Sequence, residues 1–313
     1  MKVFYSDRFV LPLPDGHRFP MEKYRMLRER VEQSGICGPG ELQEPRALTD
    51  EELLAVHTES YLESLVTGTI SAKDARRIGF PWSLEMIERC RRTCGGTLGG
   101  ALAALEEAGS SGWGVAANLA GGTHHAFAHR GEGFCVFNDS ALAAKSLQSG
   151  GYAEKVVVVD TDVHQGNGTA TILEGDDSVF TFSIHGAKNF PFHKERSDLD
   201  IALDDKTGDE EYLDSLRRGL DESLESIDAD VAIFLAGADP FEGDRLGRMS
   251  VTKEGLMGRD QLVLDTLRER GIPTVITMGG GYARDVEDTV DAHSNTVGYA
   301  ATLHDEVPSK SKI

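Results

Sequence analysis

The sequence has few cysteines and few lysines, and it lacks long apolar runs. Its 313 residues contain four cysteines, too few for a disulfide scaffold. The spacings between Cys37, Cys90, Cys94 and Cys135 do not match the paired pattern of a structural zinc site. We therefore expect reduced, mostly buried thiols. Because the first residues do not read as a charged and then apolar leader, we also expect a cytoplasmic protein.

No stretch of the sequence approaches 18 consecutive apolar residues, so we expect no membrane span. Positive charge is also scarce. The 32 basic residues, of which only 11 are lysine, stand against 52 acidic ones, and the formal net charge is −20. This balance argues against nucleic-acid binding and against docking on anionic lipid, since both need a basic surface. It is compatible with a cationic substrate, although a global charge does not identify one.

The rest of the composition is that of an ordinary globular protein, with 40% hydrophobic and 27% charged residues. Short apolar or β-branched runs alternate with amphipathic segments. The runs predict strands at Val115–Ala117, Val156–Val159, Val179–Ile184, Val231–Leu235 and Thr274–Met278. The amphipathic segments predict helices at Thr49–Leu65, Leu84–Glu107, Asp139–Gln148, Glu210–Ser226 and Thr252–Glu269. Thr49, with Glu52 three residues later, is the expected N-cap of the first helix.

Continuous apolar strands separated by helices predict an α/β fold whose mainly parallel central sheet is covered on both faces. The expected architecture is therefore a three-layer α/β/α sandwich. No linker, repeat or low-complexity stretch divides the chain. We expect a single domain over residues 1–301, followed by a flexible polar tail over residues 302–313.

Asp160, Asp162 and His164 directly follow the predicted strand Val156–Val159. Alternate side chains of an extended segment share a face, so these three groups point the same way. Two carboxylates and an imidazole at one strand end conflict electrostatically unless a cation neutralises them. A divalent metal bound by carboxylate oxygen and imidazole nitrogen resolves the conflict. The alternative is a solvated acidic turn in which one aspartate caps the next helix.

His124 and His125 follow two glycines just past the predicted strand Val115–Ala117. On a turn, adjacent histidines can both point into one cleft and act as acid and base, each held in one tautomer by a hydrogen-bond acceptor. Asp160 and Asn167 are the candidate acceptors. The alternative is a histidine that satisfies a hydrogen bond in the core.

Two more motifs follow the predicted strands Val231–Leu235 and Thr274–Met278. Asp239 could complete the metal set, or merely begin a turn before a proline. Tyr282 follows three glycines and could donate its hydroxyl to an oxyanion, or be an ordinary buried tyrosine. Ligands of open α/β sheets bind beyond the carboxyl ends of the strands, and four such motifs end four separate strands. Together they predict metal-assisted hydrolysis of an amide.

The sequence resembles the histone deacetylase family, the arginase-fold zinc amidohydrolases that include acetylpolyamine and acetoin-utilisation-type bacterial members. The resemblance lies in the stretches GGTHHAFAHRGEGFCVFND, DTDVHQGNGT, AGADPFEGDRLGRMSVT and GGGY, in the family's order, and extends back through VHTESYL and YSDRF. It therefore covers nearly the whole chain and implies an arginase/deacetylase-like fold. The form HQGNG, together with EGDRLG, is most similar to the class IV branch.

The resemblance also implies roles for individual residues. The catalytic Zn²⁺, with Fe²⁺ as the alternative, would be held by Asp162, His164 and Asp239. The catalytic groups would be His124, His125 and Tyr282, with Asp160 behind His124 and Asn167 behind His125. The walls of the substrate tunnel would be Phe134 and Phe190, with Gly133. A structural K⁺ or Na⁺ would be held by Asp160, Asp162, His164, Ser183 and Ile184, several through backbone carbonyls.

The chain departs from many relatives in three places. Asn167 stands where many have aspartate, and Gln165 where many have histidine. A neutral amide stabilises a protonated His125 less than a carboxylate would, so we expect His125 to be neutral and to act as the general base, or as acid and base in turn. The segment Phe192–Ser197 lacks the Pro-Gly-Thr-Gly run of other branches, which leaves the tunnel rim and the acyl selectivity open.

These observations predict a zinc-dependent amidohydrolase that removes an acetyl or longer acyl group from a lysine-type amine. The expected partner is an acyl-lysine peptide or protein, or a small acylated amine. One alternative is a small-molecule hydrolase such as an acetylpolyamine amidohydrolase, and another is a metal-binding interaction module without catalysis. The sequence assigns no oligomeric state.

Overall fold

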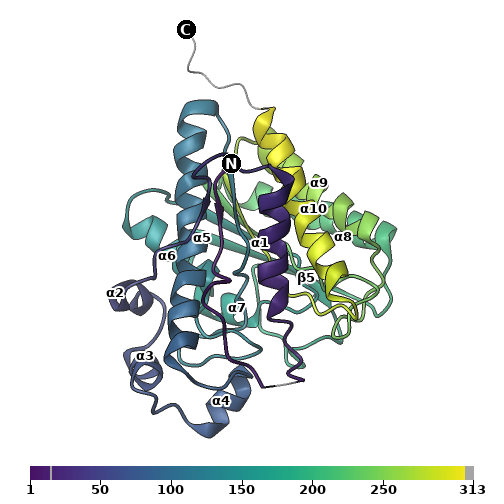
Figure 1. Cartoon of the computed structure of the whole chain (residues 1–313). Helices are drawn as coiled ribbons and strands as arrows, with labels where there is room; N and C mark the ends of the chain where they lie inside the picture. Colours follow the sequence, from purple (N-terminus) through teal and green to yellow (C-terminus); the bar gives the residue numbers. More distant parts are fainter. Residues whose placement is uncertain (15, 307–313) are drawn as a thin grey trace.

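The computed structural model describes residues 1–14 and 16–306. Within these ranges one parallel sheet has the strand order β2-β1-β3-β8-β7-β4-β5-β6 (Figure 1). Its strands are β1 (Val3–Phe4), β2 (Leu42–Gln43), β3 (Val115–Asn118), β4 (Val156–Asp160), β5 (Val179–Gly186), β6 (Leu199–Leu203), β7 (Val231–Leu235) and β8 (Thr274–Thr277). Its helices are α1 (Glu22–Ser34), α2 (Asp50–Leu54), α3 (Glu59–Val66), α4 (Ala72–Ile78), α5 (Leu84–Ser111), α6 (Asp139–Ser149), α7 (Asn167–Leu173), α8 (Asp209–Ser226), α9 (Lys253–Glu269) and α10 (Val286–Asp305). The predicted α/β fold with a parallel sheet is confirmed.

Helices cover both faces of the sheet, as Figure 1 shows, with α1, α8, α9 and α10 on one side and α5 and α6 on the other. A hydrophobic core lies on each face of the sheet, and successive side chains of a strand point alternately into one core and the other. Val157 and Val159 of β4 are buried in the first core, and Val156 and Val158 are buried in the second. A strand buried on both faces has to be apolar at every position, which is why the central strands could be recognised as short continuous apolar runs.

Helix α5 packs closely against the sheet. It contains several glycines, which ordinarily weaken a helix interior. A Cβ at Gly100 would lie 2.6 Å from Cγ2 of Val275 on β8, so the missing side chain is what lets the helix approach the strand. Among the described residues, no helix has the length and apolar character needed to cross a membrane.

One predicted helix and the start of the predicted tail need correction. The segment Thr49–Leu65 forms two helices, α2 and α3, because His57 turns inward to bond the Phe127 carbonyl and the chain is extended at Thr58. The capping box at Thr49 is present as predicted. Helix α10 continues through Asp305, so the first residues of the predicted tail 302–313 are helical. Residues 307–313 of that tail lie outside the described residues.

The four central strands β3, β8, β7 and β4 are neighbours and parallel, so their carboxyl ends meet at one edge of the sheet. Each of the four motifs singled out in the sequence follows one of these strands. The sheet therefore brings together side chains that are more than 150 residues apart in the chain.

Candidate metal centre and active site

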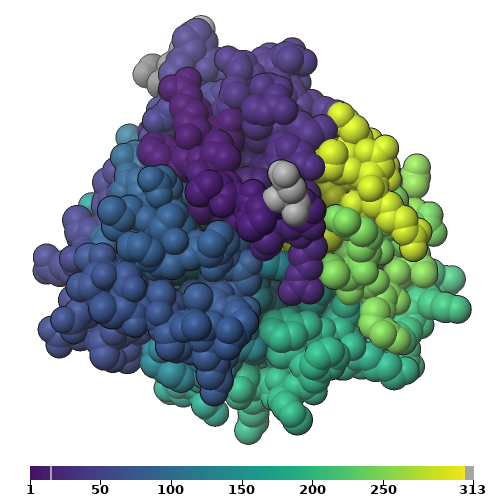
Figure 2. All heavy atoms as spheres, turned by 60° about the horizontal axis from the view of Figure 1, so that its bottom comes forward, coloured from purple at the N-terminus to yellow at the C-terminus, as the bar shows by residue number. Residues whose placement is uncertain are grey.

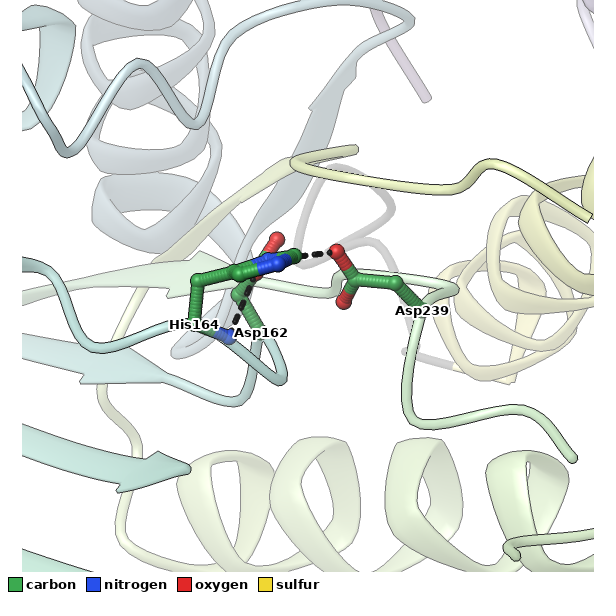
Figure 3. Close-up of side chains that lie close together, drawn as sticks. All are labelled: Asp162, His164 and Asp239. Atoms are coloured by element: carbon green, nitrogen blue, oxygen red, sulfur yellow. Dashed lines mark hydrogen bonds and ion pairs between the residues drawn. The ribbon is translucent and has the colours of Figure 1, made fainter. Parts of the chain in front are cut away.

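The three residues predicted to hold the divalent metal form a buried cluster (Figure 3). Asp162 and His164 lie on the loop after β4, and Asp239 lies on the loop after β7. Nδ1 of His164 is 2.9 Å from Oδ1 of Asp162 and 3.0 Å from Oδ2 of Asp239. One potential ligand atom from each residue lies within 4.8 Å of the other two. The structure thus brings together His164 and Asp239, which are 75 positions apart in the sequence.

The second oxygen of each carboxylate is held by the backbone. The N–H of Gly280 donates to Oδ2 of Asp162 at 2.7 Å, and the N–H of Val163 donates to Oδ1 of Asp239 at 2.9 Å. A Cβ at Gly280 would lie 2.0 Å from Oδ2 of Asp239, so only glycine leaves this space open. The backbone therefore fixes both carboxylates with one oxygen directed at the centre of the cluster.

The charges of this cluster conflict in the absence of a cation. Burial, together with the charge of Asp162, raises the pKa of Asp239 to about 7. Burial lowers the pKa of His164, but Asp239 and then Asp162 outweigh it and raise the pKa to about 10. Two dry carboxylates and one imidazole are a ligand set that suits a divalent ion, and an ion here would replace the proton on His164. The residues therefore fit the metal that the sequence predicts.

His124 and His125 lie beside this cluster with their ring centroids 4.1 Å apart. Nδ1 of His124 is 2.7 Å from Oδ2 of Asp160, and Nδ1 of His125 is 2.7 Å from Oδ1 of Asn167. Both predicted acceptors are therefore in contact with the predicted histidines. The other nitrogen of His124, Nε2, lies 3.9 Å from Oδ1 of Asp162, and His125 lines the same cavity as His164.

The two histidines differ in charge. Burial lowers the pKa of His124, but the carboxylates of Asp160 and Asp162 raise it to about 9. Burial and the neighbouring His124 and His164 hold the pKa of His125 well below its usual value. The direction for His125 agrees with the expectation from Asn167, but burial is its largest cause. Of the pair, His125 is thus the neutral member.

Tyr282 follows β8 and lines the same cavity as His125 and His164. Its backbone N–H donates to Oδ2 of Asp244 at 2.6 Å, and its carbonyl accepts from Nε of Arg245 at 3.0 Å. Burial and the charge of Asp239 raise the pKa of its hydroxyl well above the usual value, so the hydroxyl stays protonated. It is available as a hydrogen-bond donor.

A cavity of about 620 Å³ leads from the surface to these groups, within the range of small-molecule sites. Phe134 and Phe190 both line it. The Phe190 ring packs edge-on against His125, with centroids 4.9 Å apart. A Cβ at Gly133 would lie 2.6 Å from Cδ2 of His125, so this glycine lets the backbone lie against the imidazole. A second cavity of about 50 Å³, lined by His124, Asp162 and Gly280 among others, lies further inside.

The residues predicted for a monovalent cation are all buried. Asp160 and Ser183 are paired across β4 and β5, and Ile184 follows on β5. Oδ1 of Asp160 accepts the N–H of Asp162 at 3.1 Å. The cation itself stays a prediction.

Several residues that shape the site were missed at the level of sequence. Asp139 accepts the N–H groups of Gly122 and Thr123, at 3.0 and 2.7 Å, and the hydroxyl of Thr97 at 2.6 Å, and so fixes the loop that carries the two histidines. Asp244 accepts two N–H groups of its own loop as well as that of Tyr282. Both lie inside the stretches quoted above, and an aspartate next to a turn was the available signal.

Gln165 has a structural role. Its side chain donates to the Glu195 carbonyl at 2.7 Å and to Oδ1 of Asp200 at 2.8 Å, and it accepts the Glu195 N–H at 2.9 Å. The amide thereby fastens the segment Phe192–Ser197 at the tunnel rim. This is the segment in which the chain departs from other branches.

The fold is that of the deacetylase type of α/β protein. It is similar to the crystal structure of an HDAC homologue complexed with SAHA, with a TM-score of 0.82 and 24% identity over 96% of this chain and 84% of that chain. It is equally similar to an HDAC homologue from Aquifex aeolicus, with a TM-score of 0.81 and 24% identity over 98% of this chain and 85% of that chain.

The chain belongs to the histone deacetylase family, because residues 17–297 match the model of the histone deacetylase domain. It is 42% identical to an uncharacterized protein of Picosynechococcus over 93% of this chain and 95% of that protein. Histone deacetylase 2 of Arabidopsis thaliana is 29% identical, over 93% of this chain and 78% of the plant protein. The acetoin utilization protein AcuC of Staphylococcus aureus is 27% identical, over 88% and 75% respectively. Family membership makes the chain a deacetylase-like amidohydrolase.

Proposed function

We propose that this chain is a zinc-dependent deacetylase that removes a short acyl group from the side chain of an acylated lysine. The proposal rests on one observation, namely that three kinds of chemical group line connected space in the protein. A buried ligand set for a divalent ion, a neutral histidine and a protonated tyrosine all face the same space. A protein that only bound a metal would not need the last two.

The histidines and the tyrosine have distinct tasks. Bound by Asp162, His164 and Asp239, Zn²⁺ would polarise the amide carbonyl and lower the pKa of a water molecule. His125 accepts the proton of the attacking water at Nε2, because its Nδ1–H is already donated to Asn167. His125 then returns this proton to the leaving amine.

Tyr282 donates its hydroxyl hydrogen to the substrate oxygen as negative charge develops there. A single donor of this kind lowers the barrier by about 3–4 kcal/mol. His124, held by Asp160, stays beside His125 and contributes positive charge next to the reacting centre.

The two cavities suggest the shape of the substrate. Phe134 and Phe190 offer apolar walls to the aliphatic stem of a lysine, which needs no hydrogen bonds there. The inner cavity of about 50 Å³ limits the acyl group. This space is much smaller than the outer cavity of about 620 Å³, so it favours an acetyl group over an octanoyl or myristoyl chain.

The test uses zinc-loaded protein and a fluorogenic acetyl-lysine peptide. We expect hydrolysis that a chelator abolishes and zinc restores, and rates that fall from acetyl- to octanoyl- and myristoyl-lysine. Tyr282→Phe should keep its zinc and lose about 100-fold or more in kcat, because one oxyanion donor is removed. Turnover of Tyr282→Phe near the wild-type level would contradict the role of Tyr282. No cleavage of any acyl-lysine by the zinc-loaded wild type would favour the non-catalytic alternative.

Two finer assignments belong to the same proposal. The sequence His164–Gly168, with the stretch Glu242–Gly247, supports a place in the class IV branch. Asp160 and Ser183 are buried and lie opposite each other on β4 and β5, which supports a structural K⁺ or Na⁺ between these strands.

A further inference from the structure

The mouth of the tunnel is basic, although the protein as a whole is strongly acidic. Five of the 16 residues that line the outer cavity are lysine or arginine, against 32 of 313 in the whole chain. We call this set the basic rim; it consists of Arg18, Arg77, Lys188, Arg245 and Arg248. With a net charge of −20, a random patch of this surface would carry the opposite sign.

Distant segments build the basic rim. Its members come from the N-terminal segment, from helix α4, from the loop after β5 and from the loop after β7. Figure 2 shows a face of the molecule on which purple, blue, teal and green segments adjoin. The carboxylate that lines the same cavity, Glu132, is paired with Arg130 at 3.3 Å. The local charge of the mouth is therefore positive.

Two members of the basic rim are attached to residues of the tunnel itself. The Arg18 guanidinium lies over the Phe134 ring, 5.0 Å from its centroid. Nε–H of Arg245 donates a hydrogen bond to the Tyr282 carbonyl at 3.0 Å. The Arg245 side chain is otherwise exposed. Arg18 and Arg245 thus carry positive charge to the entrance, next to a tunnel wall and to the proposed oxyanion donor.

The other three cations already have partners. Arg77 pairs with Asp74 at 2.7 Å, and Arg248 and Lys188 share Asp205 at 2.6 and 3.9 Å. For Arg18 and Arg245, by contrast, residues 1–14 and 16–306 supply no carboxylate at ion-pair distance. With respect to the part of the chain that the structure describes, these two guanidinium groups are the ones most available to a substrate.

The position of the positive charge determines which part of a substrate meets it. The inner cavity, which would hold the acyl group, has no lysine or arginine in its lining. The basic rim instead surrounds the entrance, where the chain that carries an acylated lysine lies outside the tunnel. The planar guanidinium presents paired donors that match a carboxylate. The rim therefore acts on the residues that flank the acylated lysine, and not on the acyl group.

We propose that the basic rim selects acyl-lysines that lie between aspartate or glutamate residues in an acidic peptide segment. This inference rests on the proposed deacetylase function and names its substrate class. It disfavours acetylpolyamines and lysine-rich tails, whose positive charges would meet Arg18 and Arg245 at the entrance. The overall negative charge of the protein does not overturn the preference, because at physiological salt its field decays over about 8 Å.

The experiment compares three peptides with the same central acetyl-lysine and flanking residues that are all aspartate and glutamate, all alanine and glutamine, or all lysine and arginine. The zinc-loaded wild type should give kcat/KM values at least 10-fold higher for the acidic peptide than for the basic one. The uncharged peptide should lie between them. Succinyl-lysine in the uncharged peptide should gain nothing over acetyl-lysine, since the rim does not reach the acyl group.

Arg18→Gln combined with Arg245→Gln should reduce the acidic-to-basic ratio to about 3-fold or less. Any general loss of turnover from the lost contact between Arg245 and Tyr282 lowers kcat/KM for the acidic and the basic peptide alike, and therefore cancels in the ratio. Arg217→Gln, at an exposed position of α8, removes one charge elsewhere and should leave the ratio unchanged. Equal kcat/KM values for the three peptides, or an unaltered ratio in the double variant, would overturn the proposal and leave the deacetylase function intact.

If none of the peptides is hydrolysed, the proposed function fails, and fluorescence anisotropy of the labelled peptides with the zinc-loaded protein then tests the rim alone. Tighter binding of the acidic peptide, lost in the double variant, would support a basic docking mouth. Equal binding of the three peptides would refute it.

Discussion

Lowering the pH from 7 to 5 should destabilise the fold through His57, a residue outside the metal centre. The side chain is 2% exposed and bonds the backbone with both ring nitrogens. Nδ1–H donates to the Phe127 carbonyl at 3.1 Å, and Nε2 accepts the N–H of Asn138 at 3.1 Å. This geometry requires the neutral ring, because a proton on Nε2 would face the Asn138 N–H.

The magnitude follows from the pKa of His57. Burial lowers this pKa from 6.5 to about 4. Because the folded-state pKa lies below the unfolded one, the stabilisation is complete above pH 6.5 and is lost as the pH falls toward 4. The full shift corresponds to about 3 kcal/mol, of which about 2 kcal/mol is lost between pH 7 and pH 5.

The assay is equilibrium unfolding in urea at pH 7 and pH 5 for the wild type and for His57→Gln, which cannot titrate. The variant is expected to be less stable at pH 7 and to lose about 2 kcal/mol less than the wild type on acidification. Other buried histidines titrate in both proteins, so their contributions cancel in the comparison. His193→Gln, at an exposed position, should behave like the wild type. Identical pH dependence for His57→Gln and the wild type would refute the reasoning.

Three further changes test the capping box at Thr49, the hydrophobic core, and the glycine that leaves room for the carboxylate of Asp239. Thr49→Ala removes the oxygen that caps α2 and should cost about 1 kcal/mol in urea unfolding; an unchanged midpoint would contradict the capping role. Phe234→Ala, at a fully buried position of β7, should cost about 3–5 kcal/mol, and a loss below 1 kcal/mol would show that the core closes the cavity. Gly280→Ala would place a Cβ 2.0 Å from Oδ2 of Asp239 and should lower the zinc content measured by atomic emission, whereas Gly298→Ala, with open space around its Cβ, should keep it. Full zinc content in Gly280→Ala would contradict the claim that zinc binding needs the open space at position 280.

The central sheet could be predicted because its strands are buried on both faces. Val231–Leu235 is apolar throughout, and β7 has these same bounds. The strands that escaped prediction lack a continuous buried apolar run of this length. Strand β1 is buried but only two residues long, β2 is two residues long and half-buried, and β6 alternates between half-buried and exposed positions before its buried last residue, Leu203.

Helix α1 was missed for a related reason. The residues that it buries are Lys23, Leu27 and Val31, a stripe of one per turn. The first of them is a lysine whose Nζ donates to the Gly281 carbonyl at 3.3 Å. An apolar periodicity that begins with a buried cation cannot be recognised without the partner, which is 258 residues away.

The membership of the candidate site followed from the sequence for a topological reason. Carboxyl ends of parallel strands meet at one edge, so polar motifs after β3, β4, β7 and β8 had to gather. What could not be foreseen is how loops arrange themselves over that edge. The net charge of the chain did not predict the basic rim, because composition averages over the whole surface and a binding site covers only a small part of it.

The position of β8 has a consequence for how the protein is made. Of the eight described strands, β8 is the last in the chain to be synthesised, yet it pairs with β3 on one side and with β7 on the other. Until Thr274–Thr277 is synthesised, the sheet consists of two halves with unpaired inner edges, and such edges favour aggregation. Insertion of this one segment joins the halves and delivers Tyr282 to its partners in the same event. A nascent chain that ends before this segment has neither a continuous sheet nor a complete site.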